Sequence, residues 1–433
     1  MGRIKQISPA RGDAFEILRE VEAGGFSSIL LAADRRELKP VDRALMHELV
    51  LGVLRWQLWL DKTIEHFAKR SIDNLDLPVR LALRLGLYQL RFLTRIPASA
   101  AVNESVNLVR SARVSSAAAF VNAVLRRSIR EADYNPASRL SDPVEKLAIE
   151  TSHPVWLIER WSNSFGLEET EAFARANNMV PPVAFRLVNT DFTDILDRLR
   201  TAGGSIEPSK VAEDAWRVSG ASSVVRKLAN EGRIYLQDEA SQLVAQTVNL
   251  KPAEHVLDLC AAPGGKTTLM AKRAANSALI VAADRSARRL ETVTKSSALH
   301  NLNSIKSVVL DAGNQLPFAD SIFDRILVDA PCSGTGTLRR NPEIRWRISE
   351  DDIRVLAAQQ KAFLHQAARV LKPGGQLVYS TCSVERDENE DVIAAFLESH
   401  RDFQQINTIR TWPHREGTDG FFIASFALSD LGC

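Results

Sequence analysis

The sequence predicts a multidomain protein with an all-α helical bundle, a small α+β domain, and an α/β domain built on a parallel sheet. Three observations predict this fold class. The chain has 433 residues, more than one hydrophobic core usually serves. Helical periodicity without any strand period runs from about residue 10 to 131. After residue 233, short apolar runs alternate regularly with amphipathic stretches. We expect the domains at residues 1–140, 150–232 and 233–433.

The first domain is expected to be a helical bundle. Phe15, Leu18 and Val21 share one helical face, and a glycine pair that favours a helix end follows them. The same periodicity continues through residues 41–70, 77–93 and 116–132. A polar, proline-containing linker ends the bundle. The mixed pattern of residues 150–232 then indicates a small α+β connecting domain.

The helical region carries an uneven charge, although the formal net charge of the chain is only +2. Between residues 79 and 130 there are nine arginines and a single acid, Glu104. Such clustering favours a polyanionic partner, and the alternative is that these arginines are the solvated faces of helices. Four further arginines at 339, 340, 345 and 347 could contact substrate phosphates, with surface solvation as the alternative. The candidate nucleic-acid-binding residues are Arg110, Arg113, Arg126, Arg127, Arg339 and Arg340.

The third domain is expected to contain a parallel sheet that helices cover on both faces. The predicted strands are the apolar runs at 255–259, 278–284, 307–312, 324–331 and 375–381. Ligands of such sheets bind beyond the carboxyl ends of the strands, near the point where the strand order switches. Polar motifs follow these runs, so we expect the functional site at this edge.

The stretch HVLDLCAAPGGKTT after the first of these strands has three possible interpretations. A dinucleotide fingerprint would need G-x-G-x-x-G, which is absent, and a P-loop would need a glycine where Cys260 stands. The remaining interpretation is a loop that binds S-adenosylmethionine, with small residues near the ligand and a helix N-terminus facing its carboxylate. The predicted cofactor loop is Cys260, Ala261, Ala262, Pro263, Gly264, Gly265 and Lys266.

Acidic residues at successive strand ends support this interpretation. Asp284 can accept hydrogen bonds from two ribose hydroxyls, and Asp311 can receive an adenine amino group. A single strand-end aspartate is more simply a helix cap. With Asp258 and Asp329 included, four successive predicted strands end in an aspartate. Helix capping alone does not readily explain an acid at all four strand ends.

The chain has only four cysteines, which is too few for a disulfide framework, and no C-x-x-C pair indicates a metal site. Cys332 in DAPCSGTG and Cys382 in STCS both follow an apolar run, where a buried structural cysteine would not be expected. Two thiols and an acid suit methylation at C5 of a pyrimidine. A thiolate first adds to C6 and activates C5, and the C5 proton must later leave.

The motifs DLCAAPGGKTT, DAPCSGTGTLRRNPEIRW and STCSVERDENE resemble those of RNA (cytosine-5) methyltransferases of the Nop2/NSUN/Sun class. Upstream, LRLGLYQLRFLTRIPASAAVNESVNLVR and FVNAVLRR resemble the NusB RNA-binding fold. The resemblance implies a NusB-like domain joined to a Rossmann-like, S-adenosylmethionine-dependent methyltransferase domain. It also implies that the target is a cytosine of small-subunit (16S) rRNA.

The resemblance further implies roles for individual residues. Cys382 would be the nucleophile, Cys332 would assist product release, and Asp329 would contact cytosine N3 and the methionine end of the cofactor. DNA cytosine-5 methyltransferases use the cysteine of a Pro-Cys pair, which here is Cys332, but the TCS motif and the NusB-like region favour Cys382. Cys260 is expected to contribute only its backbone, and Cys433 has no expected role. We expect Glu388 and Glu390 in the first turn of the next helix.

Two alternatives to this function stay open. One is the same chemistry on tRNA, and the other is a non-catalytic RNA-binding or ribosome assembly factor. The N-terminal stretch has no apolar signal region and no run is long enough to span a bilayer, so we expect a cytoplasmic protein without a membrane partner. We also expect a monomer that holds no metal.

Overall fold

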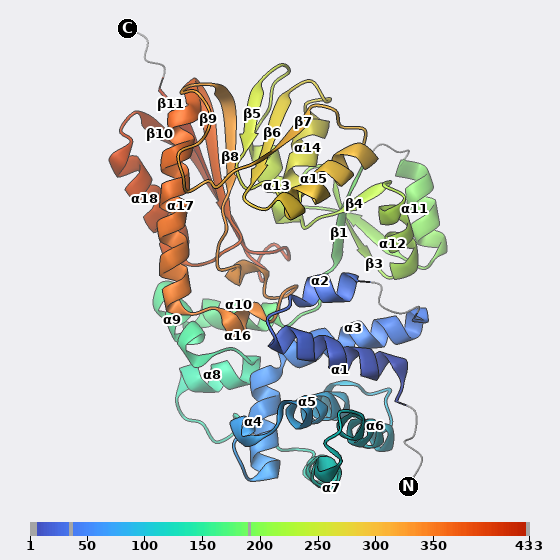
Figure 1. Ribbon diagram of the computed structural model, residues 1–433. Coiled ribbons are helices and arrows are strands. Elements are labelled where there is room, and N and C mark those ends of the chain that lie inside the picture. Colours follow the sequence, from blue (N-terminus) through green and yellow to red (C-terminus); the bar gives the residue numbers. More distant parts are fainter. Residues whose placement is uncertain (1–6, 34–37, 189–191, 430–433) are drawn as a thin grey trace. The chain divides into compact units, whose positions relative to one another are not determined.

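The computed structural model describes residues 7–33, 38–188 and 192–429 (Figure 1). The chain divides into two compact units. The first comprises Met1–Met179 together with Leu338–Arg347, and the second comprises Val180–Thr337 together with Ile348–Cys433. In the described part of the chain, no helix has the length and apolar character needed to cross a membrane.

The first unit is helical, as predicted. Its main bundle consists of α1 (Pro9–Glu22), α2 (Ser27–Ala32), α3 (Pro40–Arg55), α4 (Gln57–Ala68), α5 (Leu77–Phe92), α6 (Ala98–Ser111) and α7 (Ala118–Arg130). Helices α1, α3 and α5 have proline in their first turn, where its missing N–H costs nothing. Helix α5 is buried almost continuously from Val79 to Gln89 and packs against α1, α3, α4, α6 and α7. It is the centre of this bundle.

Three further helices complete the first unit: α8 (Pro143–Thr151), α9 (Val155–Phe165) and α10 (Leu167–Asn177). The fully buried ring of Trp161 holds this group together, because it packs edge-on against Phe173 with ring centres 4.7 Å apart. The proposed boundaries at 1–140, 150–232 and 233–433 stay a prediction.

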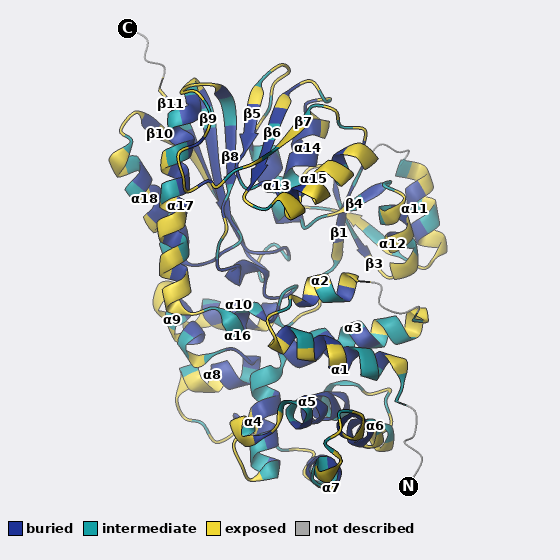
Figure 2. Cartoon of the chain, in the orientation of Figure 1, coloured by how far each residue is buried: buried dark blue, intermediate teal, exposed yellow. Residues whose placement is uncertain are grey.

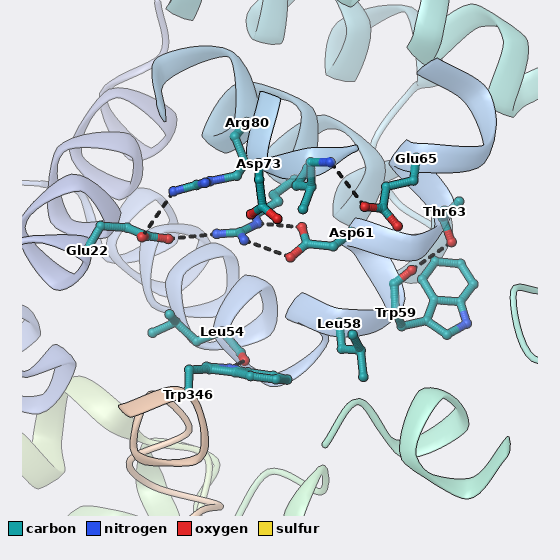
Figure 3. A network of polar contacts seen from close by, with 12 residues as sticks. Glu22, Leu54, Leu58, Trp59, Asp61, Thr63, Glu65, Asp73, Arg80 and Trp346 are labelled. Atoms are coloured by element: carbon teal, nitrogen blue, oxygen red, sulfur yellow. Dashed lines mark hydrogen bonds and ion pairs between the residues drawn. The ribbon is translucent and has the colours of Figure 1, made fainter. Parts of the chain in front are cut away.

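Residues Leu338–Arg347, here called the anchor segment, belong to the helical unit although they follow the Cys332 motif in the chain. They include the short helix α16 (Ile344–Arg347). Arg345 is fully buried and donates to the carbonyl oxygen of Ser152 and to Oδ1 of Asn178, both at 3.0 Å. The indole N–H of Trp346 donates to the carbonyl oxygen of Leu54 at 2.8 Å (Figure 3). Glu343 accepts from the backbone N–H and the hydroxyl of Ser27, the first residue of α2.

The second unit begins with a small antiparallel sheet of order β2-β3-β1-β4. Its elements are β1 (Val183–Leu187), α11 (Phe192–Thr201), β2 (Ser205–Pro208), β3 (Ala215–Ser219), α12 (Ser222–Asn230) and β4 (Ile234–Leu236). Phe185, Val218 and Ile234 of the sheet are buried with Leu199 of α11 and Leu228 of α12. The predicted α+β character of this region is confirmed.

A seven-stranded sheet of order β10-β11-β9-β8-β5-β6-β7 forms the rest of the second unit. Its strands are β5 (His255–Asp258), β6 (Leu279–Asp284), β7 (Ile305–Val309), β8 (Phe323–Asp329), β9 (Leu371–Thr381), β10 (Phe403–Thr411) and β11 (Phe421–Leu428). Strands β5 to β9 are parallel, but β11 is antiparallel to β9 and to β10. The sheet is therefore mixed, and the prediction of a parallel sheet holds only for five strands. The short connection from β10 to β11 cannot make the long crossover that parallel pairing needs.

Helices cover both faces of this sheet (Figure 1). They are α13 (Glu239–Thr247), α14 (Gly265–Arg273), α15 (Ala287–Leu299), α17 (Glu350–Val370) and α18 (Glu390–Ser399). Leu257, Ile326 and Leu377 pack with α17 and α18, whereas the adjacent Val256, Leu327 and Val378 pack with α13 and α14. Neighbouring residues of one strand are thus buried on opposite faces, and most of each inner strand is dark blue in Figure 2.

The strand order switches between β5 and β8, because the chain adds β6 and β7 on one side of β5 and β8 and β9 on the other. The carboxyl ends of β5, β8 and β9 are therefore neighbours. In the register of the sheet, Asp258 of β5 lies beside Leu327 of β8, and Asp329 of β8 pairs with Ser380 of β9. This is the position at which such sheets bind ligands.

Candidate active site

The two cysteines predicted to act on the substrate lie side by side. Cys382 directly follows β9 and Cys332 follows β8 by three residues, so the parallel pairing of these strands brings the thiols together. Their sulfur atoms are 3.3 Å apart, and both residues are half-buried. The contact with Cys382, together with burial, raises the pKa of the Cys332 thiol well above its usual value. Two thiols this close do not ionise together, so one stays protonated when the other becomes a thiolate.

Backbone contacts fix the loops that carry the thiols. The N–H of Gly336 donates to the carbonyl oxygen of Cys382 at 3.0 Å. The N–H of Gly420, just before β11, donates to the carbonyl oxygen of Gly336 at 2.8 Å. A Cβ on Gly336 would lie only 1.9 Å from the carbonyl oxygen of Gly420, so no larger residue fits here. The spacing of the thiols thus depends on a close approach of two backbone segments.

Glu388 connects the two cysteine loops. It is fully buried and accepts from the backbone N–H of Ser333 at 2.8 Å, from the hydroxyls of Ser333 and Ser383, and from the side-chain amide of Gln360. Burial raises its pKa despite these donors. The prediction that Glu388 lies in the first turn of the next helix was wrong, because it ends a separate 3-10 turn, and only Glu390 begins α18. The buried polar groups of the Cys332 loop and of the Cys382 loop thus donate hydrogen bonds to the same carboxylate.

Asp329 forms an ion pair with Lys266 of the predicted cofactor loop. The ammonium nitrogen lies 2.6 Å from Oδ2 of Asp329, and the hydroxyl of Ser380 donates to Oδ1 at 2.8 Å. Burial disfavours the ammonium form of Lys266, but the adjacent Asp329 outweighs it and the pKa of Lys266 is raised. The sequence placed both residues in the site, but it gave no sign of this pair.

The predicted cofactor loop, residues 260–266, connects β5 to α14. Gly264 has a φ of +106°, and a Cβ on it would lie 3.1 Å from the Cα of Val293 in α15. Only glycine therefore lets the loop close against α15. Below the loop, the hydroxyl of Thr267 donates to Oδ2 of Asp258 at 2.7 Å, and burial raises the pKa of Asp258 to about 7. The buried Oδ1 of Asp258 has no hydrogen-bond partner within the described residues.

The other strand-end acids lie at the same edge of the sheet. Asp284 is the last residue of β6 and is almost fully buried, and its carboxylate is 3.1 Å from the guanidinium of Arg289. It does not cap α15, because the cap is the side chain of Ser286. Asp311 follows β7 by two residues, is exposed, and accepts from the N–H of Gly313 at 2.9 Å.

These groups fit S-adenosylmethionine. The loop is built from small residues and closes on a required glycine, so its backbone can approach a bulky ligand. The buried Asp258 offers an acceptor oxygen that the described part of the protein leaves unpaired, and the carboxylate of Asp284 stands at the next strand end. When bound, this cofactor supplies an electrophilic methyl group.

The other two cysteines of the chain are Cys260 and Cys433. Cys260 is half-buried in the loop, and burial raises the pKa of its thiol well above the usual value. It therefore stays protonated at neutral pH, and the use of its backbone alone stays a prediction. Cys433 lies outside the described residues.

The arginines predicted to contact nucleic acid have different environments. Arg110, Arg113 and Arg126 are exposed, Arg127 and Arg340 are half-buried, and Arg339 is buried. Elsewhere in the arginine run, Arg84 is buried in a bidentate pair with Asp61 at 2.7 and 2.8 Å, and it reaches Glu22 at 2.7 Å. Figure 3 shows this network between Glu22 and Asp61. The run is therefore not one exposed patch, and contact of the six candidates with nucleic acid stays a prediction.

Comparison with known proteins agrees with this architecture. Residues 245–427 match the family model described as 16S rRNA methyltransferase RsmB/F. Residues 8–130 match the NusB family, and residues 153–225 match the ferredoxin-like domain of RsmF/B-like methyltransferases.

Relatives and solved structures extend the similarity to nearly the whole chain. The probable ribosomal RNA small subunit methyltransferase B of Bacillus subtilis is 35% identical over 96% of this chain and 98% of its own length. The ribosomal RNA small subunit methyltransferase B of Pseudomonas putida is 38% identical over 82% of this chain and 81% of its own. The crystal structure of PH0851 covers 98% of this chain and 100% of its own at 28% identity, with a TM-score of 0.84.

A second crystal structure, of a methyltransferase homolog protein from Pyrococcus horikoshii, covers 66% of this chain and 99% of its own at 28% identity, with a TM-score of 0.58. The C-terminal part of the chain is thus a methyltransferase domain whose cofactor is S-adenosylmethionine. The chain belongs to the ribosomal RNA small subunit methyltransferase B family.

Proposed function

We propose that this protein transfers a methyl group from S-adenosylmethionine to C5 of a cytosine in 16S rRNA, through a covalent adduct between Cys382 and C6. One observation carries the chemistry: two thiols 3.3 Å apart at the ends of neighbouring strands, next to the Lys266–Asp329 pair. The names of the relatives, which are small-subunit rRNA methyltransferases, support the choice of RNA. A cytoplasmic location and a monomeric state stay predictions.

In the proposed reaction, the thiolate of Cys382 forms a bond to C6 of the cytosine. The electron pair of the C5–C6 bond becomes available at C5, which then takes the methyl group. Asp329, which takes a hydrogen bond from the ammonium of Lys266 at 2.6 Å, passes a proton from that ammonium to N3 while the ring carries the added electron pair, and N3 returns the proton when the C6–sulfur bond breaks. The C5 proton then leaves, and the C6–sulfur bond breaks to release the methylated base and the thiolate.

Cys332 is assigned to the release step for a physical reason. While Cys382 is a thiol or thiolate 3.3 Å away, it opposes ionisation of Cys332. Once Cys382 has become a neutral thioether on C6, this opposition disappears. Cys332 can then lose its proton to water and, as a thiolate, accept the one that leaves C5.

The serines beside the thiols have a separate role in this scheme. Ser333 and Ser383 direct their hydroxyls to Glu388, so the carboxylate of Glu388 is already hydrogen-bonded within the protein. We propose that Glu388 is a structural connection between the loops and that it does not exchange protons with the substrate.

The test uses unmodified small-subunit rRNA, purified full-length protein and S-adenosylmethionine labelled in its methyl group. After digestion to nucleosides, label is expected in 5-methylcytidine, and none is expected with the Cys382→Ala variant. A parallel reaction with tRNA distinguishes the substrate alternative. Label in tRNA but not in rRNA would overturn the choice of RNA. If neither RNA is labelled, in free form or within small subunits, a non-catalytic assembly role replaces the proposal.

A further inference from the structure

Arg186 links the small sheet to the start of the helix that follows the cofactor loop. It belongs to β1, and its Nη2 donates to the hydroxyl of Thr268 at 2.8 Å and to the carbonyl oxygen of Gly265 at 3.4 Å. Its Nε donates to the side-chain carbonyl of Gln237 at 3.1 Å. Thr268 in turn donates to the carbonyl oxygen of Gly264 at 2.7 Å. One guanidinium thus reaches the last glycines of the loop directly and through one hydroxyl.

The environment of Arg186 is unusual for a buried arginine. Only 2% of the residue is exposed, yet no carboxylate pairs with it among the described residues. Its acceptors are neutral, and its guanidinium lies over the ring of Tyr235 at 4.5 Å. Burial lowers its pKa to about 10, so it stays charged at neutral pH. Burying a charge without a counter-ion is costly, and a purely structural contact does not require it.

Steric contacts on the same side of the loop support a positioning role. A Cβ on Gly265 would lie 3.2 Å from the ring of Tyr235 and 3.3 Å from the amide of Gln237. The two residues that hold the guanidinium are therefore also the surface against which Gly265 packs. The guanidinium also adds positive charge near the first turn of α14, where the helix dipole already favours an anionic group.

We propose that Arg186 is a positioning residue for the cofactor loop: it holds residues 264–268 in the conformation that receives S-adenosylmethionine. The inference rests on the proposed function, because it takes residues 260–266 as the cofactor site. It assigns to the small domain a part in cofactor binding in addition to any contact with RNA.

A second arginine of the same sheet provides a matched control. Arg217 of β3 also reaches out of the small sheet, with its Nε 2.6 Å from Glu239 of α13 and its Nη2 donating to the carbonyl oxygen of Glu416 at 2.9 Å. No contact of Arg217 with residues 260–268 is found in the described part of the chain. Loss of Arg217 removes a comparable link without touching the cofactor loop.

The experiment measures the equilibrium dissociation constant of S-adenosylmethionine by calorimetry for full-length Arg186→Met, Arg186→Lys, Arg217→Met and Asp284→Ala. We expect Arg186→Met to weaken binding at least about ten-fold, since it removes charged hydrogen bonds to the loop. Arg186→Lys, which keeps the charge and can keep one bond, should recover part of the loss. The dissociation constant of Arg217→Met should stay within about two-fold of the parent value, even if its melting temperature falls as much as that of Arg186→Met.

Two further readouts separate positioning from a loss of folding. Amide hydrogen exchange should increase at residues 264–268 in Arg186→Met and not in Arg217→Met. In steady state, the KM for S-adenosylmethionine should rise while kcat at saturating cofactor stays within a few-fold. Equal weakening by Arg186→Met and Arg217→Met, or unchanged binding in Arg186→Met, would overturn the inference. Unchanged binding in Asp284→Ala would instead contradict the cofactor site of the proposed function.

Discussion

The strand ends of the second unit and the arginine run of the helical unit both contain clustered polar residues, but the structure uses them differently. At the strand ends, Cys332, Cys382 and Asp329 converge at one edge of the sheet. In the arginine run, side chains diverge: Arg84 is buried in ion pairs, whereas Arg126 is exposed. Parallel strands bring their carboxyl ends together whatever the side chains are, whereas successive helices point their residues in all directions. A backbone pattern therefore locates a site better than a count of charges does.

The largest effect is expected at the strand ends. Cys382→Ala should lower methylation of rRNA at least about 1,000-fold, because it removes the proposed nucleophile. The melting temperature should change little, since the residue is half-buried and alanine leaves only a small void. Activity is measured with labelled S-adenosylmethionine, and stability by thermal unfolding. Substantial remaining activity in a folded variant would show that the strand-end thiols are not used as proposed.

In the helical unit, the largest effect is expected on stability. Arg84→Met should cost about 3–5 kcal/mol of unfolding free energy, because it leaves Asp61 and Glu22 without their buried partner. Methylation at saturating RNA should be unaffected at temperatures where the variant is folded. Urea unfolding followed by circular dichroism measures the change. A cost below about 1 kcal/mol would mean that this arginine behaves like an exposed one.

Asp258 gives a pH-dependent test of the strand-end region. Its pKa is about 7 in the folded protein, against an ordinary value of 3.8, so between these two pH values the folded state holds a proton that the unfolded chain has lost. Its contribution to stability is complete below about pH 4 and declines as pH rises through 7, by up to about 4 kcal/mol in total. Asp258→Asn cannot ionise and should remove this decline.

The measurement compares urea unfolding of Asp258→Asn and the parent protein at pH 5 and pH 8, without cofactor. Asparagine can still accept from Thr267, and at pH 5 the parent has lost only part of the Asp258 contribution, so the two proteins should differ less in stability at pH 5 than at pH 8. At pH 8 the variant should be the more stable of the two. An identical pH dependence in both proteins would show that Asp258 is not the group that titrates.

The smallest effect is expected for the exposed arginines. Arg126→Gln should weaken binding of rRNA a few-fold without changing the stability of the protein. The slope of the logarithm of the binding constant against the logarithm of the salt concentration should become shallower by about one. Arg175→Gln is the control, because Arg175 is also exposed but lies in α10, outside the arginine run, and pairs with Glu150 and Glu171. Filter binding over a range of salt concentrations makes the comparison. Equal behaviour of the two variants would remove the basis for assigning RNA contact to the arginine run.

Much of the fold could be predicted because it follows from short-range patterns. Alternation of apolar runs and amphipathic helices located β5, β6, β8 and the end of β9 closely. Strand β10 was missed because it lies at the edge of the sheet and most of its central residues are exposed, so it lacks an apolar signal. Because β10 was not predicted, the antiparallel part of the sheet was not predicted either.

The parts of the site that were missed depend on contacts between residues far apart in the chain. The pairing of Lys266 with Asp329 joins residues 63 positions apart, and Glu388 meets Ser333 across 55 positions. Arg345 has no local signal for burial, yet it lies inside the helical unit with its hydrogen bonds on Ser152 and Asn178. Sequence motifs identified the residue types that the chemistry needs, and the tertiary fold decides which of them meet.

The most direct test of the account is to find which cysteine becomes attached to RNA. Cys332→Ala is incubated with unmodified small-subunit rRNA and S-adenosylmethionine, denatured, digested, and mapped by mass spectrometry. Because product release is impaired, a protein–RNA adduct that resists denaturation should accumulate, with the nucleotide on Cys382 and with C5 methylated. Cys382→Ala should form no adduct. A stable adduct on Cys332 in the Cys382→Ala protein, with none on Cys382 in Cys332→Ala, would contradict the account and exchange the two roles.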